Sequence, residues 1–267
     1  MPRLTLTGLT LYPIKSAAGI RVSHWEVDAF GLQHDRRWMV VDSAGNFLTQ
    51  RSHPRLALVH PSTRDGALRV EAPDVPALEL PLHPSSPVRT SVVVWRDRCD
   101  ALWLGERPAE WFSRVLGCDC SLVYMPDDSV RPTDPIVTPR SVPSARVSFA
   151  DGFPFLLISQ ESLDDLNGRL TTPLPMNRFR PNLVIAGGHP FVEDELRSFQ
   201  IAGIRFEVVK PCDRCAITTT DQETARRGKE PLHTLATYRR RGSAVFFGQN
   251  VVHQGRGRLS VRDPLLV

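Results

Sequence analysis

A CxxC pair in the C-terminal third of the chain lies within the run Lys210-Pro211-Cys212-Asp213-Arg214-Cys215-Ala216-Ile217-Thr218-Thr219-Thr220-Asp221. Cysteines at this spacing are typical of a redox-active dithiol, of a zinc site, or of a single thiolate that binds another metal. A thioredoxin-like dithiol places its first cysteine at the N-terminus of a helix. The residues from Ala216 to Thr220 are largely β-branched and predict a strand instead, which disfavours the dithiol.

The zinc hypothesis needs four ligands, and Cys118 and Cys120 would complete a set with Cys212 and Cys215. The single residue between Cys118 and Cys120 is a shorter gap than is usual between zinc ligands. The segment around them also resembles the beginning of an ordinary strand. A zinc-stabilised binding module without enzymatic activity is therefore an alternative, but the spacing does not favour it.

The third hypothesis is a single thiolate that neighbouring arginines hold in its ionised form. Arg214 is adjacent to Cys215, and the fold could bring Arg178 and Arg180 close to it. Cations favour the thiolate, which is the form of cysteine that binds metals. The alternative is that both cysteines are small apolar residues of the core, which is common for free cysteine.

The composition is that of an ordinary globular protein. The chain has 267 residues, 41% hydrophobic and 23% charged, enough for one large domain or two small ones. Its net charge of +4 is too small to indicate nucleic-acid binding. No apolar run is long enough to cross a membrane, and the N-terminus lacks the pattern of a signal peptide. We therefore expect a cytoplasmic protein with no nucleic-acid or membrane partner.

The five cysteines of the chain, an odd number, argue against a disulfide framework.

The first half of the chain predicts short strands of a sandwich or barrel, separated by Pro and Gly. Their expected ranges are residues 4–12, 21–28, 37–42, 47–50, 57–60, 68–71, 78–82, 91–94 and 121–125. A helix is expected over residues 108–116, because proline suits a first turn and Gly117 suits a C-cap. The segment 126–146 is rich in Pro, Asp, Ser and Thr and predicts a linker or mobile loop.

The second half predicts further strands and a second helix. The helix would be capped by Ser159 or Ser162 and bury Leu163, Leu166 and Leu170 on one face. The strands are expected at residues 153–159, 182–186, 204–210, 216–220, 244–247 and 257–261. The whole pattern predicts a mixed α/β fold that is predominantly antiparallel β.

Several short motifs accompany the cysteine run in a fixed order: Tyr12-Pro13-Ile14-Lys15-Ser16, Gly31-Leu32, Asp35-Arg36-Arg37-Trp38, Leu163-Asp164-Asp165-Leu166-Asn167, Arg178-Phe179-Arg180-Pro181-Asn182 and Phe247-Gly248-Gln249. Together they resemble the MOSC-domain family, which includes the mitochondrial amidoxime-reducing components and bacterial YcbX-like proteins. The resemblance covers nearly the whole chain. It implies an N-terminal β-barrel-like domain over residues 1–122, packed on a MOSC β-barrel domain over residues 123–267 with a few helices.

The resemblance also implies a molybdenum cofactor, in which molybdopterin carries the metal. In this family the second cysteine of the pair is the protein ligand to molybdenum, which makes Cys215 the expected metal ligand and catalytic residue. Cys212 would be only a neighbour. The positions that the resemblance assigns to cofactor binding are Lys15, Ser16, Arg36, Ser159, Arg180, Asn182, Asp213 and Arg214. Lysine and arginine suit an anionic cofactor and thiolate suits a soft metal. Pro181 is expected to hold Arg180 in an extended conformation.

The activity that the resemblance implies is the reduction of N-hydroxylated or N-oxide small molecules. The chain ends at Val267 without the ferredoxin-like domain of many bacterial relatives. Electrons are therefore expected from a separate flavoprotein, ferredoxin or haem protein. The sequence also lacks the N-terminal membrane anchor of the mitochondrial relatives. A second hypothesis keeps the fold but makes Cys215 a carrier of sulfur or cofactor, because MOSC domains also resemble part of the molybdenum-cofactor sulfurases.

Overall fold

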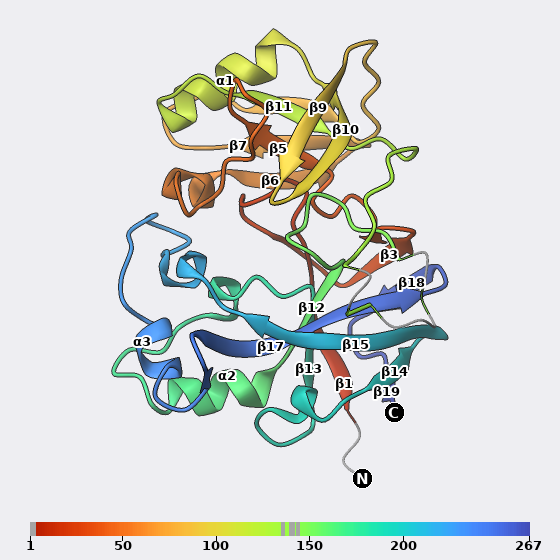
Figure 1. Ribbon diagram of the computed structural model, residues 1–267, viewed down its shortest axis with the longest axis vertical. Coiled ribbons are helices and arrows are strands. Elements are labelled where there is room, and N and C mark those ends of the chain that lie inside the picture. Colours follow the sequence, from red (N-terminus) through yellow and green to blue (C-terminus); the bar gives the residue numbers. More distant parts are fainter. Residues whose placement is uncertain (1–3, 135–136, 139–141, 143–144) are drawn as a thin grey trace.

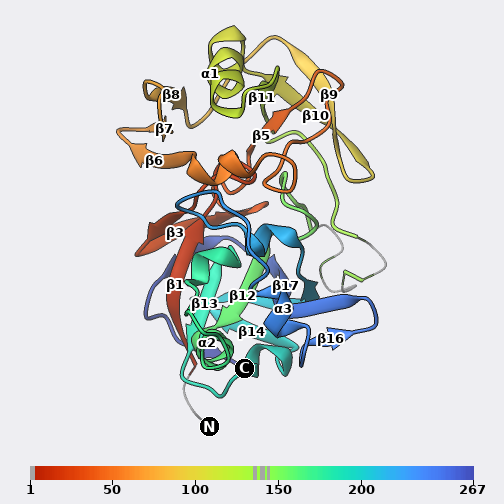
Figure 2. The ribbon, with the colours of Figure 1, turned by 90° about the vertical axis from the view of Figure 1, so that its left-hand side faces the viewer.

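The computed structural model describes residues 4–134, 137–138, 142 and 145–267, which form two lobes (Figure 1). The upper lobe comes from the first half of the chain, coloured orange to yellow-green. The lower lobe comes from the second half together with the N-terminal strand, in red. The C-terminus lies at the far side of the lower lobe, away from the upper one (Figure 2).

The lower lobe is built on one large sheet. Its strands, in order across the sheet, are β19 (Leu265–Leu266), β14 (Ser198–Ile201), β15 (Ile204–Asp213), β17 (Ala244–Gln254), β12 (Phe155–Ser159), β13 (Leu183–Ala186), β1 (Thr5–Leu11) and β2 (Ile20–Val22), with β16 (Arg240–Arg241) beside β17. Neighbouring strands are antiparallel except β12 and β13, which are parallel. A register shift in β1 between Leu6 and Gly8 lets Leu6, Leu9 and Leu11 all face the core.

Helices cover part of this sheet. The helix α2 (Gln160–Asn167) follows β12 directly and buries Leu163 and Leu166. The short helix α3 (Leu232–Leu235) packs against β17. Single 3₁₀ turns occur at Pro54–Leu58, Met176–Arg178, Val192–Asp194 and Ala216–Thr219.

The upper lobe contains two smaller antiparallel sheets and one longer helix. One sheet has the order β5 (Trp38–Val41), β11 (Ser121–Tyr124), β10 (Asp97–Trp103) and β9 (Arg89–Val94), and the other joins β6 (His60–Arg64), β7 (Ala67–Glu71) and β8 (Leu78–Pro81). The helix α1 (Glu106–Leu116) buries Phe112 in a core shared with Trp38. It ends where Gly117 takes the left-handed conformation, φ 71°, which glycine adopts without strain.

The N-terminal strands belong to the lower lobe although they precede the upper lobe in the sequence. Strand β1 pairs with β13, and β3 (His24–Asp28) pairs with both β4 (Gly31–Leu32) and β18 (Gly257–Ser260). The chain therefore begins in the lower sheet, builds the upper lobe and then returns. The predicted division at residues 122 and 123 separates strands that pair with each other, and the domain boundary stays a prediction.

The predicted mixed fold, dominated by antiparallel strands, is confirmed. Residues 57–60 were expected as a strand, but Pro54 instead begins a 3₁₀ turn there. Residues 47–50 contribute only a single bridge, from Phe47 to Val41, in place of the expected strand. The segment 126–146, expected as a linker or mobile loop, lies partly outside the described residues, at 135–136, 139–141 and 143–144.

The prediction of a strand over residues 216–220 is wrong, and the reason is local. The hydroxyl of Thr218 donates to the carbonyl of Cys215 at 3.0 Å, and that of Thr219 donates to the carbonyl of Ala216 at 2.8 Å. Threonine side chains that bond to nearby backbone groups compete with a strand ladder. These residues therefore close a 3₁₀ turn directly after the cysteine pair.

Candidate functional site

A cavity of about 370 Å³ opens between side chains of the two lobes. It gathers residues that are far apart in the sequence. The predicted site residues that line it are Lys15, Ser16, Arg36, Arg180, Asn182, Asp213, Arg214 and Cys215. All the predicted site residues except Ser159 therefore meet around one space.

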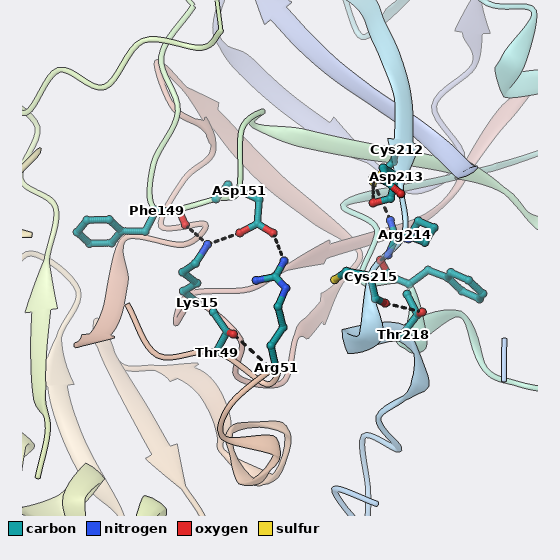
Figure 3. A network of polar contacts seen from close by, with 12 residues as sticks. Lys15, Thr49, Arg51, Phe149, Asp151, Cys212, Asp213, Arg214, Cys215 and Thr218 are labelled. Atoms are coloured by element: carbon teal, nitrogen blue, oxygen red, sulfur yellow. Dashed lines mark hydrogen bonds and ion pairs between the residues drawn. The ribbon is translucent and has the colours of Figure 1, made fainter. Parts of the chain in front are cut away.

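Cys215 lies immediately after β15, where the chain leaves the sheet. Its backbone is extended, with φ −107° and ψ 178°, and the following 3₁₀ turn ties its carbonyl to Thr218. The side chain is partly buried, and its sulfur faces Arg51 across the cavity (Figure 3). The thiol is thus held by the backbone at a fixed point of the cavity wall and remains accessible from within.

Cys212 has a different environment from Cys215. Its sulfur lies 3.0 Å from Nη1 of Arg214, whose Nη2 donates to the carbonyl of Phe179 at 2.7 Å. The arginine between the two cysteines therefore points toward Cys212 and the Phe179 backbone. Both cysteines line the cavity, but the sulfur of Cys212 contacts Arg214, whereas that of Cys215 faces Arg51.

Lys15, Asp151 and Arg51 form a chain of ion pairs along the wall (Figure 3). Nζ of Lys15 donates to the carbonyl of Phe149 at 2.7 Å and to Oδ1 of Asp151 at 2.5 Å. Nη2 of Arg51 donates to Oδ2 of Asp151 at 3.0 Å. Burial lowers the pKa of Lys15 to about 8, although Asp151 opposes this effect. The two cations hold the pKa of Asp151 below its usual range despite the burial that would raise it.

Arg51 connects this chain to Cys215. Burial disfavours its charge, but Asp151 and Cys215 outweigh that effect and raise the pKa of Arg51. Its Nη1 is buried and has no hydrogen-bond partner among the described residues. A buried guanidinium nitrogen in this state has N–H groups that could donate to a bound acceptor.

A loop carries Asp151 to the cavity, and Arg131 holds that loop. Nη1 of Arg131 donates to the carbonyls of Ser148, at 2.7 Å, and Ala150, at 2.6 Å. The Arg131 side chain is almost fully buried and also pairs with Asp97. Arg131 therefore helps to fix the segment before Asp151 to the upper lobe, together with the bond from Lys15 to the carbonyl of Phe149.

Arg36 and Arg180 both lie against the ring of Tyr12. Their Cζ atoms are 4.5 Å and 4.3 Å from the centre of the Tyr12 ring. Arg36 is paired: Nη1 contacts Oδ2 of Asp35 at 2.5 Å and Oδ1 of Asn182 at 2.8 Å. Asn182 in turn donates to Asp35 at 3.1 Å, which fixes the orientation of its amide.

Arg180 carries a buried charge with no carboxylate at ion-pair distance among the described residues. Only 9% of the residue is exposed, and burial lowers the pKa of its guanidinium to about 10. A buried cation without an acidic partner is costly, and an anion in the cavity would compensate it. This arginine is the clearest sign that the cavity takes an anionic ligand.

Four described residues of the cavity wall have strained backbones. Ser16, Arg36, Trp95 and Arg180 have φ values of 67°, 49°, 59° and 57°, in the left-handed region that residues with a side chain rarely adopt. Such strain concentrates at functional sites. The prediction that Pro181 holds Arg180 extended is wrong, because Arg180 turns the chain directly after the 3₁₀ turn Met176–Arg178.

Ser159 is placed elsewhere. It is fully buried, and its hydroxyl caps α2 by accepting from the backbone N–H of Ser162 at 3.1 Å. It does not line the cavity, so its assignment to cofactor binding is replaced by a structural role.

The four cysteines of the zinc hypothesis do not meet. Cys118 and Cys120 pack with the core of the upper lobe, and Cys212 packs with a cluster beside α2. Across the described ranges, no group of three or more His, Cys, Asp or Glu side chains is arranged to hold a metal.

A metal bound to Cys215 in the cavity would need ligands beyond the protein. A cofactor with its own sulfur donors and a phosphate would meet that need. It fits the partly buried thiol of Cys215 and the arginines that have no carboxylate partner among the described residues.

Reasoning from the sequence missed Arg51, Asp151 and Trp95, which also line the cavity. Arg51 and Trp95 stand in loops of the upper lobe, and Asp151 stands in the loop before β12. Their side chains reach the cavity only because the lobes pack together. The one signal in the sequence was the Asp151-Gly152 pair before a buried strand, which is typical of a turn and not of a site.

No helix among the described residues has both the length and the apolar character needed to span a membrane.

Comparisons with known proteins place both halves of the chain. Residues 3–119 match the MOSC N-terminal beta barrel domain and residues 144–265 match the MOSC domain. The mitochondrial amidoxime-reducing component 1 of Mus musculus is 33% identical over 98% of this chain and 81% of its own length. Its Homo sapiens counterpart is 32% identical over 98% of this chain and 82% of its own length. The molybdenum cofactor sulfurase of Oryza sativa subsp. japonica is 33% identical over 91% of this chain, but the match covers only 32% of that protein. The chain therefore belongs to the family of MOSC-domain proteins that carry a MOSC N-terminal β-barrel domain.

Proposed function

We propose that the protein is a molybdenum-cofactor-dependent reductase of N-hydroxylated or N-oxide small molecules, acting in the cytoplasm. The observation that carries this proposal is the cavity itself. An accessible cysteine, Cys215, shares it with the buried guanidinium of Arg180, which has no carboxylate partner among the described residues. The relationship to two proteins named as amidoxime-reducing components supports the choice of substrate.

The chain offers separate groups for the metal and for the anionic part of the cofactor. The thiolate of Cys215 would bind molybdenum. Arg180, Arg36 and Lys15 would hold the phosphate and the polar pterin. Ser16, Asn182, Asp213 and Arg214 line the same cavity and supply further polar contacts.

The proposed reaction removes one oxygen atom from nitrogen. For a hydroxylamine-type substrate, R–NH–OH, two electrons and two protons give R–NH₂ and water as the N–O bond breaks. When bound, the molybdenum cofactor would supply the two-electron chemistry of this step. The electrons would come from a separate protein donor, a flavoprotein, ferredoxin or haem protein. Nζ of Lys15, with its pKa lowered to about 8, holds a proton at the cavity wall at neutral pH.

The decisive experiment is metal and pterin analysis of protein made in a host that synthesises the cofactor. We expect about one molybdenum and one pterin per chain, and reduction of benzamidoxime with reduced methyl viologen as electron donor. Cys215→Ser should lose the metal and the activity, whereas Cys212→Ser should keep most of both. Equal losses in the two variants, or zinc in place of molybdenum, would contradict the proposal.

The match to molybdenum cofactor sulfurases favours a second candidate, in which Cys215 carries sulfur or cofactor to another protein. This chain corresponds to about a third of those relatives. The same preparation separates the two functions. A carrier would transfer its cofactor or sulfur to an acceptor protein and would not turn over benzamidoxime.

A further inference from the structure

A half-exposed tryptophan lies at the edge of the cavity. Trp95 is the first residue of the two-residue turn between β9 and β10, and 49% of it is exposed. It nevertheless lines the same cavity as Cys215. The ring therefore belongs to the wall of the site although it comes from the upper lobe.

Trp95 is an unfavourable residue for its position in the turn. Its φ is 59°, in the left-handed region, where two-residue hairpin turns favour Asn, Asp or Gly. A bulky aromatic residue with positive φ is rare. Since about half of the residue is exposed, burial does not compensate for this strain. The fold alone gives no reason for tryptophan here, and a ligand would.

Two neighbours fix the orientation of the ring. Cζ of Arg51 lies 4.6 Å from the ring centre, and the Phe47 ring packs edge-on at a centroid distance of 5.1 Å. Arg51 is itself held by Asp151 and interacts with Cys215. The aromatic surface is thus held in a defined relation to the thiol by a short series of side chains.

We propose that Trp95 is the specificity-determining residue of the cavity, where it binds the flat aromatic or heteroaromatic part of the substrate while the N–O group faces Cys215. This inference rests on the proposed function. Aromatic rings attract one another in offset or edge-on arrangements beyond the effect of buried area, and a saturated ring of the same size lacks that attraction. The wall should therefore select flat substrates by binding them and leave the N–O chemistry unchanged.

The test compares two substrates with the same N–O group, benzamidoxime and cyclohexanecarboxamidoxime, on the cofactor-loaded protein. Trp95→Leu should raise KM for benzamidoxime by about threefold to tenfold and leave kcat nearly unchanged. Its KM for the cyclohexane compound should change much less, and Trp95→Phe should restore most of the preference. Val88→Ala removes another exposed apolar side chain of the upper lobe that does not line the cavity, and it should behave as wild type.

Binding without turnover separates this inference from the proposed function. Benzamidoxime is titrated calorimetrically into each loaded variant without an electron donor. Weaker binding by Trp95→Leu would support the role of Trp95 even if the wild-type protein reduced neither compound. If both compounds are reduced and Trp95→Leu leaves KM unchanged, the proposed role of Trp95 is overturned, while the proposed reductase function stands. An equal fall in kcat for both substrates would also overturn it, because the ring would then serve only to hold Arg51.

Discussion

The side-chain amides of Gln50 and Gln222 donate to each other across the two lobes, at 3.0 Å in each direction. Both residues are buried. Nε2 of Gln50 also donates to the carbonyl of Ser16 at 2.7 Å, and Ser16 lines the cavity with a strained backbone. The pair therefore joins the lobes and fixes one part of the cavity wall.

The destabilising effects of removing the two amides should not add. Gln222→Leu leaves the buried amide of Gln50 without one partner, which should lower the free energy of unfolding by about 1–3 kcal/mol. In the double variant Gln50→Leu/Gln222→Leu the loss should be smaller than the sum of the two single losses. Urea unfolding of the four proteins measures the coupling. Strict additivity would show that the two amides act independently.

Retention of the cofactor should weaken as the pH rises through about 8. Burial lowers the pKa of Lys15 to that value, so the cavity loses one positive charge above it, while Asp151 stays ionised. Loss of this charge should reduce the affinity for an anionic cofactor by about tenfold. Molybdenum that remains after dialysis at a series of pH values gives the measurement. Lys15→Arg should hold the cofactor to higher pH, and Lys15→Met should bind it weakly at every pH. A wild-type profile that is flat across this range would remove Lys15 from cofactor binding.

Arg180→Met should separate binding from stability. The substitution removes a buried cation that has no acidic partner among the described residues, so the empty protein should be at least as stable as wild type. Its molybdenum and pterin content should fall severalfold, because the anion loses a buried donor. Arg169→Met is the matched control, since Arg169 lies 4.2 Å over the Tyr238 ring but does not line the cavity. Full cofactor content in Arg180→Met would contradict the assignment of Arg180 to cofactor binding.

Arg36→Ala should likewise lower cofactor content.

Ser159→Ala should affect stability and leave the cofactor in place. Loss of the cap on α2 should cost about 1 kcal/mol of unfolding free energy. Asn182→Ala, a change at another buried uncharged polar residue, should instead lower cofactor content because Asn182 lines the cavity. Thermal unfolding and metal analysis of both variants give the comparison. If Ser159→Ala lost as much cofactor as Asn182→Ala, Ser159 would have a role in cofactor binding.

The sequence predicts those parts of the fold in which local pattern and tertiary packing agree. The alternation over residues 4–12 matches β1, and Gly117 ends α1 as expected. Prediction fails where side chains bond to nearby backbone, as in the turn at Ala216–Thr219. Arg180 is a similar case, because its left-handed backbone depends on its surroundings and not on Pro181 alone.

The residues of the candidate site also fall into two groups, those that a local motif indicates and those that only the packing brings in. Short motifs indicate Lys15, Arg36, Arg180 and Cys215, and the structure brings these residues to one cavity. The residues that contact them from distant parts of the sequence could not be predicted from short motifs. Asp151 reaches Lys15 from 136 positions away, and its loop depends on the backbone contacts of Arg131. Such pairings are set by how the lobes pack, which no local pattern encodes.

The return of the chain to its first strands has a consequence for synthesis on the ribosome. Strand β1 can pair early with β2, but it lacks its other partner until Leu183–Ala186 has been made. Strand β3 can pair early with β4, but it lacks β18 until Gly257–Ser260 emerges. The strands of the upper lobe, up to Tyr124, are complete far earlier. We therefore expect the upper lobe to fold first, while one edge of β1 and one edge of β3 stay unpaired until late in translation. Deletion of the last few residues would then disturb the packing of the first strands of the chain.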